Sequence, residues 1–81
     1  MSLNEASRHF LPINKWSINN VLEWLQRKVP NVHEAYASNF VENQITGETL
    51  LDLNEDCLDY LEIKDLKLRF LFTTRLFFLQ I

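Results

Sequence analysis

Trp16-Ser-Ile-Asn-Asn-Val-Leu-Glu-Trp-Leu25 is the stretch of sequence that decides the fold of this chain. Ser17 is a residue type that commonly caps the start of a helix, and Trp16 before it can serve as an apolar staple. The apolar residues that follow have the spacing of one buried helix face: Val21, Leu22, Trp24 and Leu25. The stretch therefore predicts an amphipathic helix that begins just after Ser17.

The end of this first helix is set by a proline. Pro30 disfavours helical geometry at Val29, so the helix is expected to stop near Lys28. At its start, Asn20 stands where a carboxylate would complete a reciprocal cap with Ser17. We therefore expect a weaker cap there.

Four more helices are predicted downstream, so the expected fold class is all-α. Their expected spans are 33–43, 47–53, 55–60 and from about residue 65 onward. The second span is expected to carry Tyr36, Phe40 and Val41 on its inner face. Thr46 and Asn54 are the expected caps of the next two helices, and Leu58 and Leu61 are expected to point inward.

Composition indicates one small folded domain. The chain has 81 residues, 47 % of them hydrophobic, and this length permits only a modest core. Gly47 is the single glycine and the one residue that adopts a left-handed backbone easily, so hairpins are disfavoured. Cys57 is the single cysteine, which excludes an internal disulfide and a multi-cysteine zinc site and fits a reducing compartment.

Targeting signals are not evident in the sequence. No apolar run approaches the length of a transmembrane segment, and the first residues lack the pattern of a signal peptide. We expect an intracellular domain, cytoplasmic or nuclear, that is part of a larger protein. Residues 1–14 are expected to form an N-terminal arm and residues 15–81 the folded domain.

The order of these motifs resembles the sterile alpha motif (SAM) domain. The opening matches its Trp-Ser followed by Val-x-x-Trp-Leu, and Tyr36 to Phe40 matches its Tyr-x-x-x-Phe. The string Asn43-Gln-Ile-Thr-Gly-Glu-Thr-Leu-Leu-Asp-Leu53 matches the middle of the family pattern. The resemblance covers about residues 15 to 80. It implies a compact five-helix bundle with a longer C-terminal helix, acting without catalysis as a protein-interaction adaptor or scaffold in a signalling or regulatory protein.

Two positions depart from the family pattern. The glycine of its Leu-Gly-Ile turn is Glu62 here, and a glycine near the start of its last helix is Lys67. Glycine at such positions permits unusual backbone angles or close approach. We therefore expect the turn into the last helix to be altered.

Charge is distributed unevenly along the chain. Residues 34–62 contain eight acids and no Lys or Arg, whereas residues 63–81 contain four bases and one acid. Opposite charges on two faces of a rigid domain favour head-to-tail contact between copies or relatives, although most charge clusters are ordinary solvated faces.

The resemblance assigns these charges to two interaction surfaces. The implied acidic surface consists of Glu48, Asp52, Glu55, Asp56 and Asp59. The implied basic surface, at the start of the last helix, consists of Lys64, Lys67 and Arg69. The implied partner is another SAM domain, of the same or a different protein, and a homo-oligomer is one expected outcome.

The last helix is apolar on more than one side. At about 100° per residue, Phe70, Phe77 and Ile81 lie near one side, and Phe72 and Leu79 lie well away from it. One of these sides must face the core. The surplus is expected to pack on the N-terminal arm, through Phe10, Leu11 and Ile13, or on another chain.

Enzymatic activity is disfavoured by the residues present. His9, His33 and Cys57 lie in no recognisable nucleophile or metal motif. No catalytic, cofactor or metal site is therefore expected.

RNA-hairpin binding is the alternative function. A sequence pI of about 5.2 and the acid-only middle oppose phosphate binding. It would also require Arg27 and Lys28 to join Lys64 and Lys67 in one basic cluster. Binding to a lipid surface through the last helix is less favoured than RNA binding, since four bases are few for a polybasic membrane-binding segment.

Overall fold

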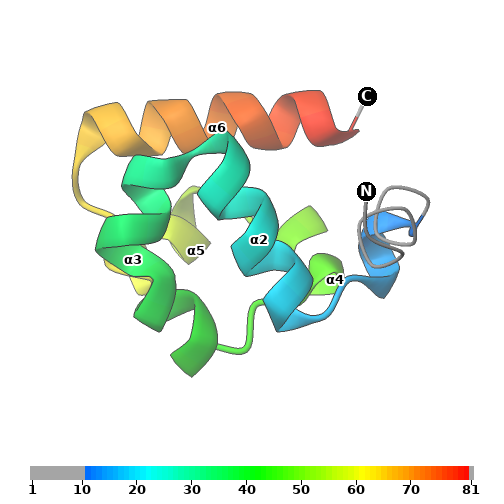
Figure 1. Cartoon of the computed structure of the whole chain (residues 1–81). Coiled ribbons are helices and arrows are strands. Elements are labelled where there is room, and N and C mark those ends of the chain that lie inside the picture. Colours follow the sequence, from blue (N-terminus) through cyan, green and yellow to red (C-terminus); the bar gives the residue numbers. More distant parts are fainter. Residues whose placement is uncertain (1–10, 81) are drawn as a thin grey trace.

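The computed structural model describes residues 11–80, and these fold into five α-helices and one 3-10 turn without a strand (Figure 1). The all-α prediction is confirmed. The elements are η1 (Ile13–Lys15), α2 (Ile18–Lys28), α3 (Pro30–Glu42), α4 (Gly47–Leu51), α5 (Glu55–Tyr60) and α6 (Leu66–Gln80). The longest helix, α6, crosses over the ends of α2 and α3, while α4 and α5 close the other side (Figure 1).

Helix α2 begins and ends where the sequence predicts. Ser17 Oγ accepts a hydrogen bond from the Asn20 N–H at 3.2 Å, and the Ser17 N–H donates to Asn20 Oδ1 at 3.0 Å. The reciprocal cap is thus complete, although an amide oxygen is a weaker acceptor than a carboxylate. The helix ends at Lys28.

Helix α3 begins earlier than the predicted His33. Its first residue is Pro30, a position where the missing N–H has no helical partner to lose and the fixed φ suits the helix. Only Val29, with φ −137°, separates α2 from α3. The prediction for Val41 is also wrong: it is 48 % exposed, whereas Phe40 beside it is fully buried.

The later helices start at polar caps, as predicted for Thr46 and Asn54. Each cap oxygen accepts a hydrogen bond from the N–H three residues on: Thr46 at 3.5 Å, Asn54 at 3.0 Å and Asp65 at 3.1 Å. Helix α4 is shorter than expected, because it ends at Leu51 and leaves Leu53 in the link to α5.

Helices α3 and α5 end in the same Schellman motif. The left-handed residue is Gln44 after α3 and Glu62 after α5, with φ 53° and 63°. The next N–H donates five residues back, from Ile45 to Phe40 at 3.0 Å and from Ile63 to Leu58 at 3.1 Å. All four of these apolar residues are buried, so packing supports each motif.

Glu62 shows what the departure from the family glycine means. The turn into the last helix keeps a left-handed residue, and the glutamate adopts that conformation. For a residue with a Cβ, this conformation costs roughly 1–2 kcal/mol. The altered residue therefore changes the stability of the turn more than its shape.

Gly47 has a different role from the one its type suggests. It does not adopt a positive φ. Instead, its N–H donates to the Trp16 carbonyl at 2.9 Å, and a Cβ at this position would lie 1.7 Å from the Ile13 oxygen. Gly47 is needed because the backbones of η1 and α4 approach closely.

An aromatic chain runs through the core. Phe72 of α6 lies edge-on between Trp24 of α2 and Phe40 of α3, with ring centroids 6.1 and 5.8 Å away. The buried apolar residues are Val21, Trp24, Leu25, Val29, Val32, Phe40, Ile45, Leu50, Leu58, Leu61, Ile63, Phe72 and Leu76. Every α-helix contributes to this cluster.

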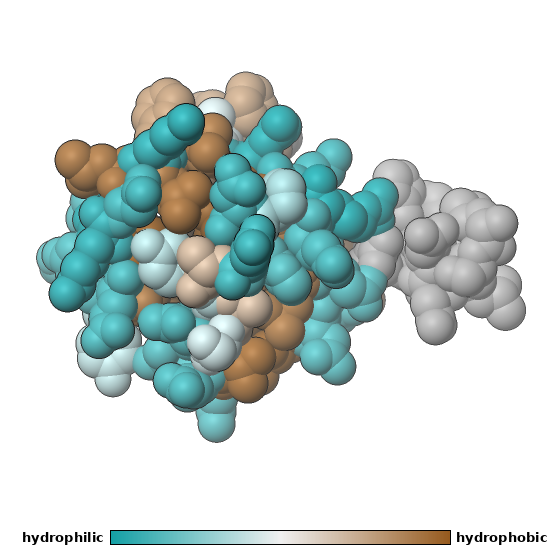
Figure 2. All heavy atoms as spheres, turned by 60° about the vertical axis from the view of Figure 1, so that its left-hand side comes forward, coloured by the Kyte–Doolittle hydropathy of each residue, from teal (hydrophilic) through white to brown (hydrophobic). Residues whose placement is uncertain are grey.

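The structure decides which side of α6 is core. Phe72 and Leu76 are buried, whereas Leu66, Phe70 and Phe77 are 79 %, 71 % and 59 % exposed. Apolar side chains consequently lie on the surface at the top of the molecule, over α6 (Figure 2).

The described part of the N-terminal arm does not cover this surface. Ile13 belongs to η1, which packs against α4, and the Leu11 carbonyl accepts a hydrogen bond from Trp16 Nε1 at 3.0 Å. Residues 1–10 of the predicted arm, with His9 and Phe10, and also Ile81 lie outside the described residues.

Candidate protein-interaction surface

The five predicted acids lie on or beside α4 and α5, and all are exposed: Glu48, Asp52, Glu55, Asp56 and Asp59. We call this set the acidic face. It borders an apolar depression of about 290 Å³ between the start of α5 and the middle of α6. Leu53, Leu58, Phe72 and Leu76 line the depression together with Asn54 and Glu55.

Local structure explains most members of the acidic face. Glu48 lies in the first turn of α4, and Glu55 and Asp56 lie in the first turn of α5. A carboxylate at a helix N-terminus is stabilised by the helix dipole. Asp52 has no such explanation, because it is the C-cap of α4, where negative charge is unfavourable.

Arg69 connects the acidic face to the last helix. Its Nη1 donates to Glu55 Oε2 at 3.2 Å, its Nη2 donates to Asp59 Oδ1, and its Nε donates to the Ile63 carbonyl. The hydrogen bond with Asp59 is the main reason that the pKa of Arg69 is raised above its ordinary value. Only 15 % of the Arg69 side chain is exposed. This arginine therefore holds α5 to α6 within one domain.

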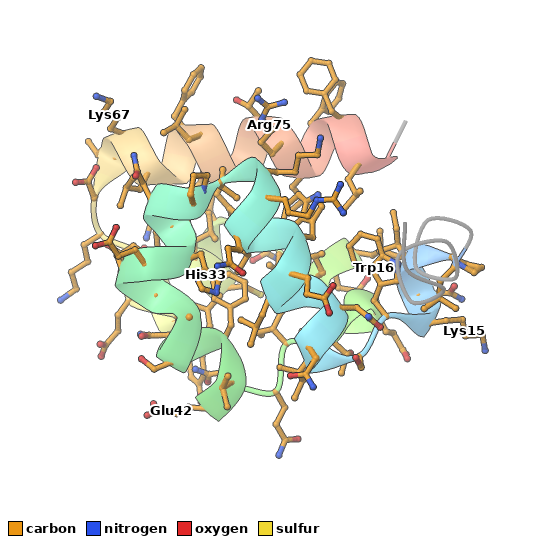
Figure 3. The ribbon with its side chains drawn as sticks, in the orientation of Figure 1. Lys15, Trp16, His33, Glu42, Lys67 and Arg75 are labelled. Atoms are coloured by element: carbon orange, nitrogen blue, oxygen red, sulfur yellow. The ribbon has the colours of Figure 1, made fainter. Side chains whose placement is uncertain are left out.

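The predicted basic surface is consequently divided. Lys67 is exposed at the second position of α6, where its side chain extends outward (Figure 3). It lines a depression of about 490 Å³ together with Asn31 and Glu34 of α3. Lys67 and Arg69 are two residues apart and so point about 200° apart around the helix. Lys64, in the link before α6, is exposed.

Lys67 resembles Asp52 in its relation to the helix dipole. A cation in the first turn of a helix lies near the positive end of the dipole. Among residues 11–80, the salt bridges are those that Arg69 makes, so neither Lys67 nor Asp52 has an ion-pair partner there. Neither charge therefore forms an ion pair within the described residues, although Glu34 and Asp65 line the same depression as Lys67.

The structure does not assemble the basic cluster that RNA binding would need. Lys28 lines a depression with Arg75 and Phe78 of α6, whereas Lys67 shares its depression with residues of α3. The charged residues that line the depression with Lys67 are the acids Glu34 and Asp65, not bases.

The histidine and the cysteine of the described residues lie apart from any metal-binding arrangement. His33 lies on α3 and Cys57 on α5, both partly exposed. Within residues 11–80, no group of three or more His, Cys, Asp or Glu residues is placed to hold a metal ion. In the same part of the chain, no helix has the length and apolar character that crossing a membrane requires.

Sequence reasoning found the charged residues but missed which of them are already paired. The partners of Arg69 are 10 and 14 residues away and become neighbours only because α5 and α6 pack together. The exposed Leu66 and Phe70 beside Lys67 were also missed as surface residues. Their apolar character alone could not separate surface from core.

Comparison with known families agrees with this fold. The model of the SAM domain (Sterile alpha motif) matches residues 13–76, from η1 through most of α6. No solved structure matches the chain.

Proposed function

Because this chain belongs to the sterile alpha motif family, we propose that it binds another SAM domain head to tail. SAM domains are generally protein-interaction modules without catalytic activity. In the proposed contact, the acidic face of one domain meets Lys64 and Lys67 of the next. The partner is a second copy or the SAM domain of another protein, and the module serves as an intracellular adaptor or scaffold.

The observation that carries this proposal is the placement of Asp52 and Lys67. Both are exposed, both lie at the helix end that disfavours their charge, and neither has an ion pair within residues 11–80. A contact that joins them removes both unfavourable placements at once. Such complementarity mainly determines partner choice and association rate.

Apolar groups accompany the charges on both surfaces. Leu66 and Phe70, beside Lys67, are 79 % and 71 % exposed. The acidic face borders the apolar depression of about 290 Å³. An exposed Leu66 or Phe70 of one domain can therefore enter the depression of the next, which supplies the buried apolar anchor that stable interfaces need.

The pairing of Arg69 narrows the set of interface residues. Since Arg69 already binds Glu55 and Asp59, the charges left for a partner are Glu48, Asp52 and Asp56 on one side and Lys64 and Lys67 on the other. Arg69 contributes by holding α5 against α6, next to the depression.

Glu48 and Asp52 lie far from the start of α6, which is at the left of Figure 1, whereas α4 is at the right. Helix α5, with the rest of the acidic face, lies nearer to α6, to which Arg69 connects it. A contact between unlike surfaces need not close, so copies can add to both ends of a growing chain. The proposed homotypic assembly is therefore a filament or short oligomer rather than a two-fold dimer.

Sedimentation velocity over a concentration series tests the contact. Lys67→Glu and Asp52→Lys should each weaken self-association about tenfold or more, because like charges then face each other. A mixture of the two variants should associate again, since each supplies the charge that the other lacks. Lys15→Glu, on the exposed η1, is the matched control and should behave as wild type.

If the wild-type chain is monomeric, the same variants test the contact with a SAM domain of another protein. They are then titrated against candidate SAM partners, where Lys67→Glu should be rescued by an acid-to-base change on the partner. If both single variants associate as well as wild type at low and moderate salt, the head-to-tail contact is wrong.

A further inference from the structure

The C-terminal half of α6 and the end of α2 form a second surface. Phe77 and Phe78 are each 59 % exposed, and their rings touch edge to face with centroids 5.9 Å apart. Beside them, Lys28, Arg75 and Phe78 line a depression of about 170 Å³ together with Trp24 and Leu79. We call Phe77, Phe78, Lys28 and Arg75 the aromatic-basic patch; Phe77 lies outside the depression and belongs to the patch through its ring contact with Phe78. It shares no residue with the proposed SAM contact.

The charge of this patch is of one sign. Helix α6 contains three bases and no acid from Leu66 to Gln80, and no carboxylate lines the depression. Lys28 and Arg75 are exposed and form no salt bridge within the described residues. The acids near α6 lie away from this patch: Asp65 caps the start of the helix, Glu34 lines the depression with Lys67, and Glu55 and Asp59 pair with Arg69 on the α5 flank. The complementary partner is therefore anionic.

The two phenyl rings indicate the shape of that partner. Consecutive residues on a helix point about 100° apart, so Phe77 and Phe78 together span a wide arc. A partner helix that packs along a strict coiled-coil seam covers a narrower arc than these two rings span. A flat apolar layer beneath an anionic surface accepts both rings and leaves the bases at the level of the charges.

We propose that the aromatic-basic patch docks on an anionic phospholipid membrane. Phe77 and Phe78 enter the boundary between headgroups and acyl chains, and Lys28 and Arg75 contact the lipid phosphates. Docking of a second copy on the same patch is disfavoured, because it brings like bases together. The start of α6 and the acidic face remain available, so lipid docking and SAM association are compatible.

Vesicle co-sedimentation of the 81-residue chain tests this proposal. Binding to phosphatidylserine-rich vesicles should exceed binding to phosphatidylcholine vesicles by roughly twenty-five-fold, at about fivefold for each of the two bases. The preference should largely disappear at about 1 M salt, where screening shortens electrostatic reach to about 3 Å.

Matched variants distinguish vesicle binding through the aromatic-basic patch from nonspecific adsorption. Joint replacement of Phe77→Ser and Phe78→Ser should lower binding about tenfold or more, since the apolar anchors are lost. Tyr60→Ser on α5, where the tyrosine is 76 % exposed, removes an aromatic of similar exposure and should have no effect. Arg75→Glu should lower binding roughly twenty-five-fold, and Lys15→Glu should not. All substituted positions are exposed, and circular dichroism verifies that each variant folds.

Three results would overturn the proposal. The first is equal or absent binding to the two vesicle types. The second is an equal loss for Tyr60→Ser and for the Phe77/Phe78 variant. The third is self-association, or binding to an RNA oligonucleotide, that depends on the Phe pair while vesicle binding does not. Lys67→Glu leaves the patch intact, so failure of the SAM contact and failure of lipid docking are distinguishable.

Discussion

Replacing Gly47 by alanine tests the contact that joins η1 to α4. The added Cβ would lie 1.7 Å from the Ile13 oxygen and 2.8 Å from Trp16 Cβ, and real Cβ atoms stay beyond 3.0 Å from such neighbours. The nearer atom belongs to the backbone, so rotating a side chain cannot relieve the overlap. The Ile13 carbonyl must therefore move by more than about 1 Å, which displaces η1 from α4.

The expected cost follows from the contacts that this movement breaks. The Gly47 N–H loses the Trp16 carbonyl, at 2.9 Å, and a buried N–H left unpaired costs about 1–3 kcal/mol. Displacement of Trp16 also loosens its contact with Trp24, whose ring centroid lies 6.5 Å away, at about 0.5–1.5 kcal/mol. Alanine regains up to about 1 kcal/mol of helix propensity. The net loss is about 2–3 kcal/mol, or roughly 10–20 °C in Tm.

Urea and thermal denaturation followed by circular dichroism measure this loss, and tryptophan fluorescence reports the environments of Trp16 and Trp24 together. Glu48→Ala is the matched control, since Glu48 is the next residue of α4 and is exposed. That change removes only a favourable dipole interaction of about 0.3–1 kcal/mol. A free energy of unfolding for Gly47→Ala within about 0.5 kcal/mol of wild type would refute the reasoning, because the close approach of the η1 and α4 backbones would then not limit the residue at this position.

Three other substitutions test separate features, each by urea denaturation unless stated. Glu62→Gly should raise stability by about 0.5–1 kcal/mol, since glycine adopts the left-handed turn without strain, whereas Glu62→Ala should show no gain. Asn20→Glu should add about 0.5 kcal/mol by supplying a charged acceptor for the Ser17 N–H, and no gain would contradict the role given to that cap. Arg69→Met should lower Tm, and added salt should lower Tm of wild type more than of the variant. Because the pKa of Arg69 is raised, its contribution is present below its ordinary pKa and is lost only at still higher pH, so the Tm difference should persist up to about pH 10.

The starts of the helices could be read from the sequence because capping is local. Ser17, Thr46 and Asn54 each bind an N–H three residues later, and this geometry needs no distant part of the chain. The start of α3 was misread because proline both ends one helix and opens the next. The sequence does not show whether the helix after Pro30 begins at the proline or a few residues later. The backbone angles at Val29 show that α3 follows α2 after this single residue.

For the candidate interaction surface, too, some features follow from the sequence and others only from the tertiary structure. The identities of the acids and bases, and their separation along the chain, were evident from the sequence alone. Which of these charges are available to a partner was not, because Arg69 reaches Glu55 and Asp59 only after α5 packs on α6. The unfavourable positions of Asp52 and Lys67 likewise depend on where α4 ends and α6 begins.

By itself, the sequence determined the all-α class, the caps and the SAM-like order of motifs, since helix formation depends on neighbours three and four residues apart. Only the tertiary structure decided which side of α6 is buried. That helix is apolar on both sides, so the spacing of its apolar residues does not identify the buried side. Phe72 faces the core because Trp24 and Phe40, brought together by the crossing of α2 and α3, enclose its ring. Phe70 and Phe77 remain exposed on the opposite side, where partners can reach them.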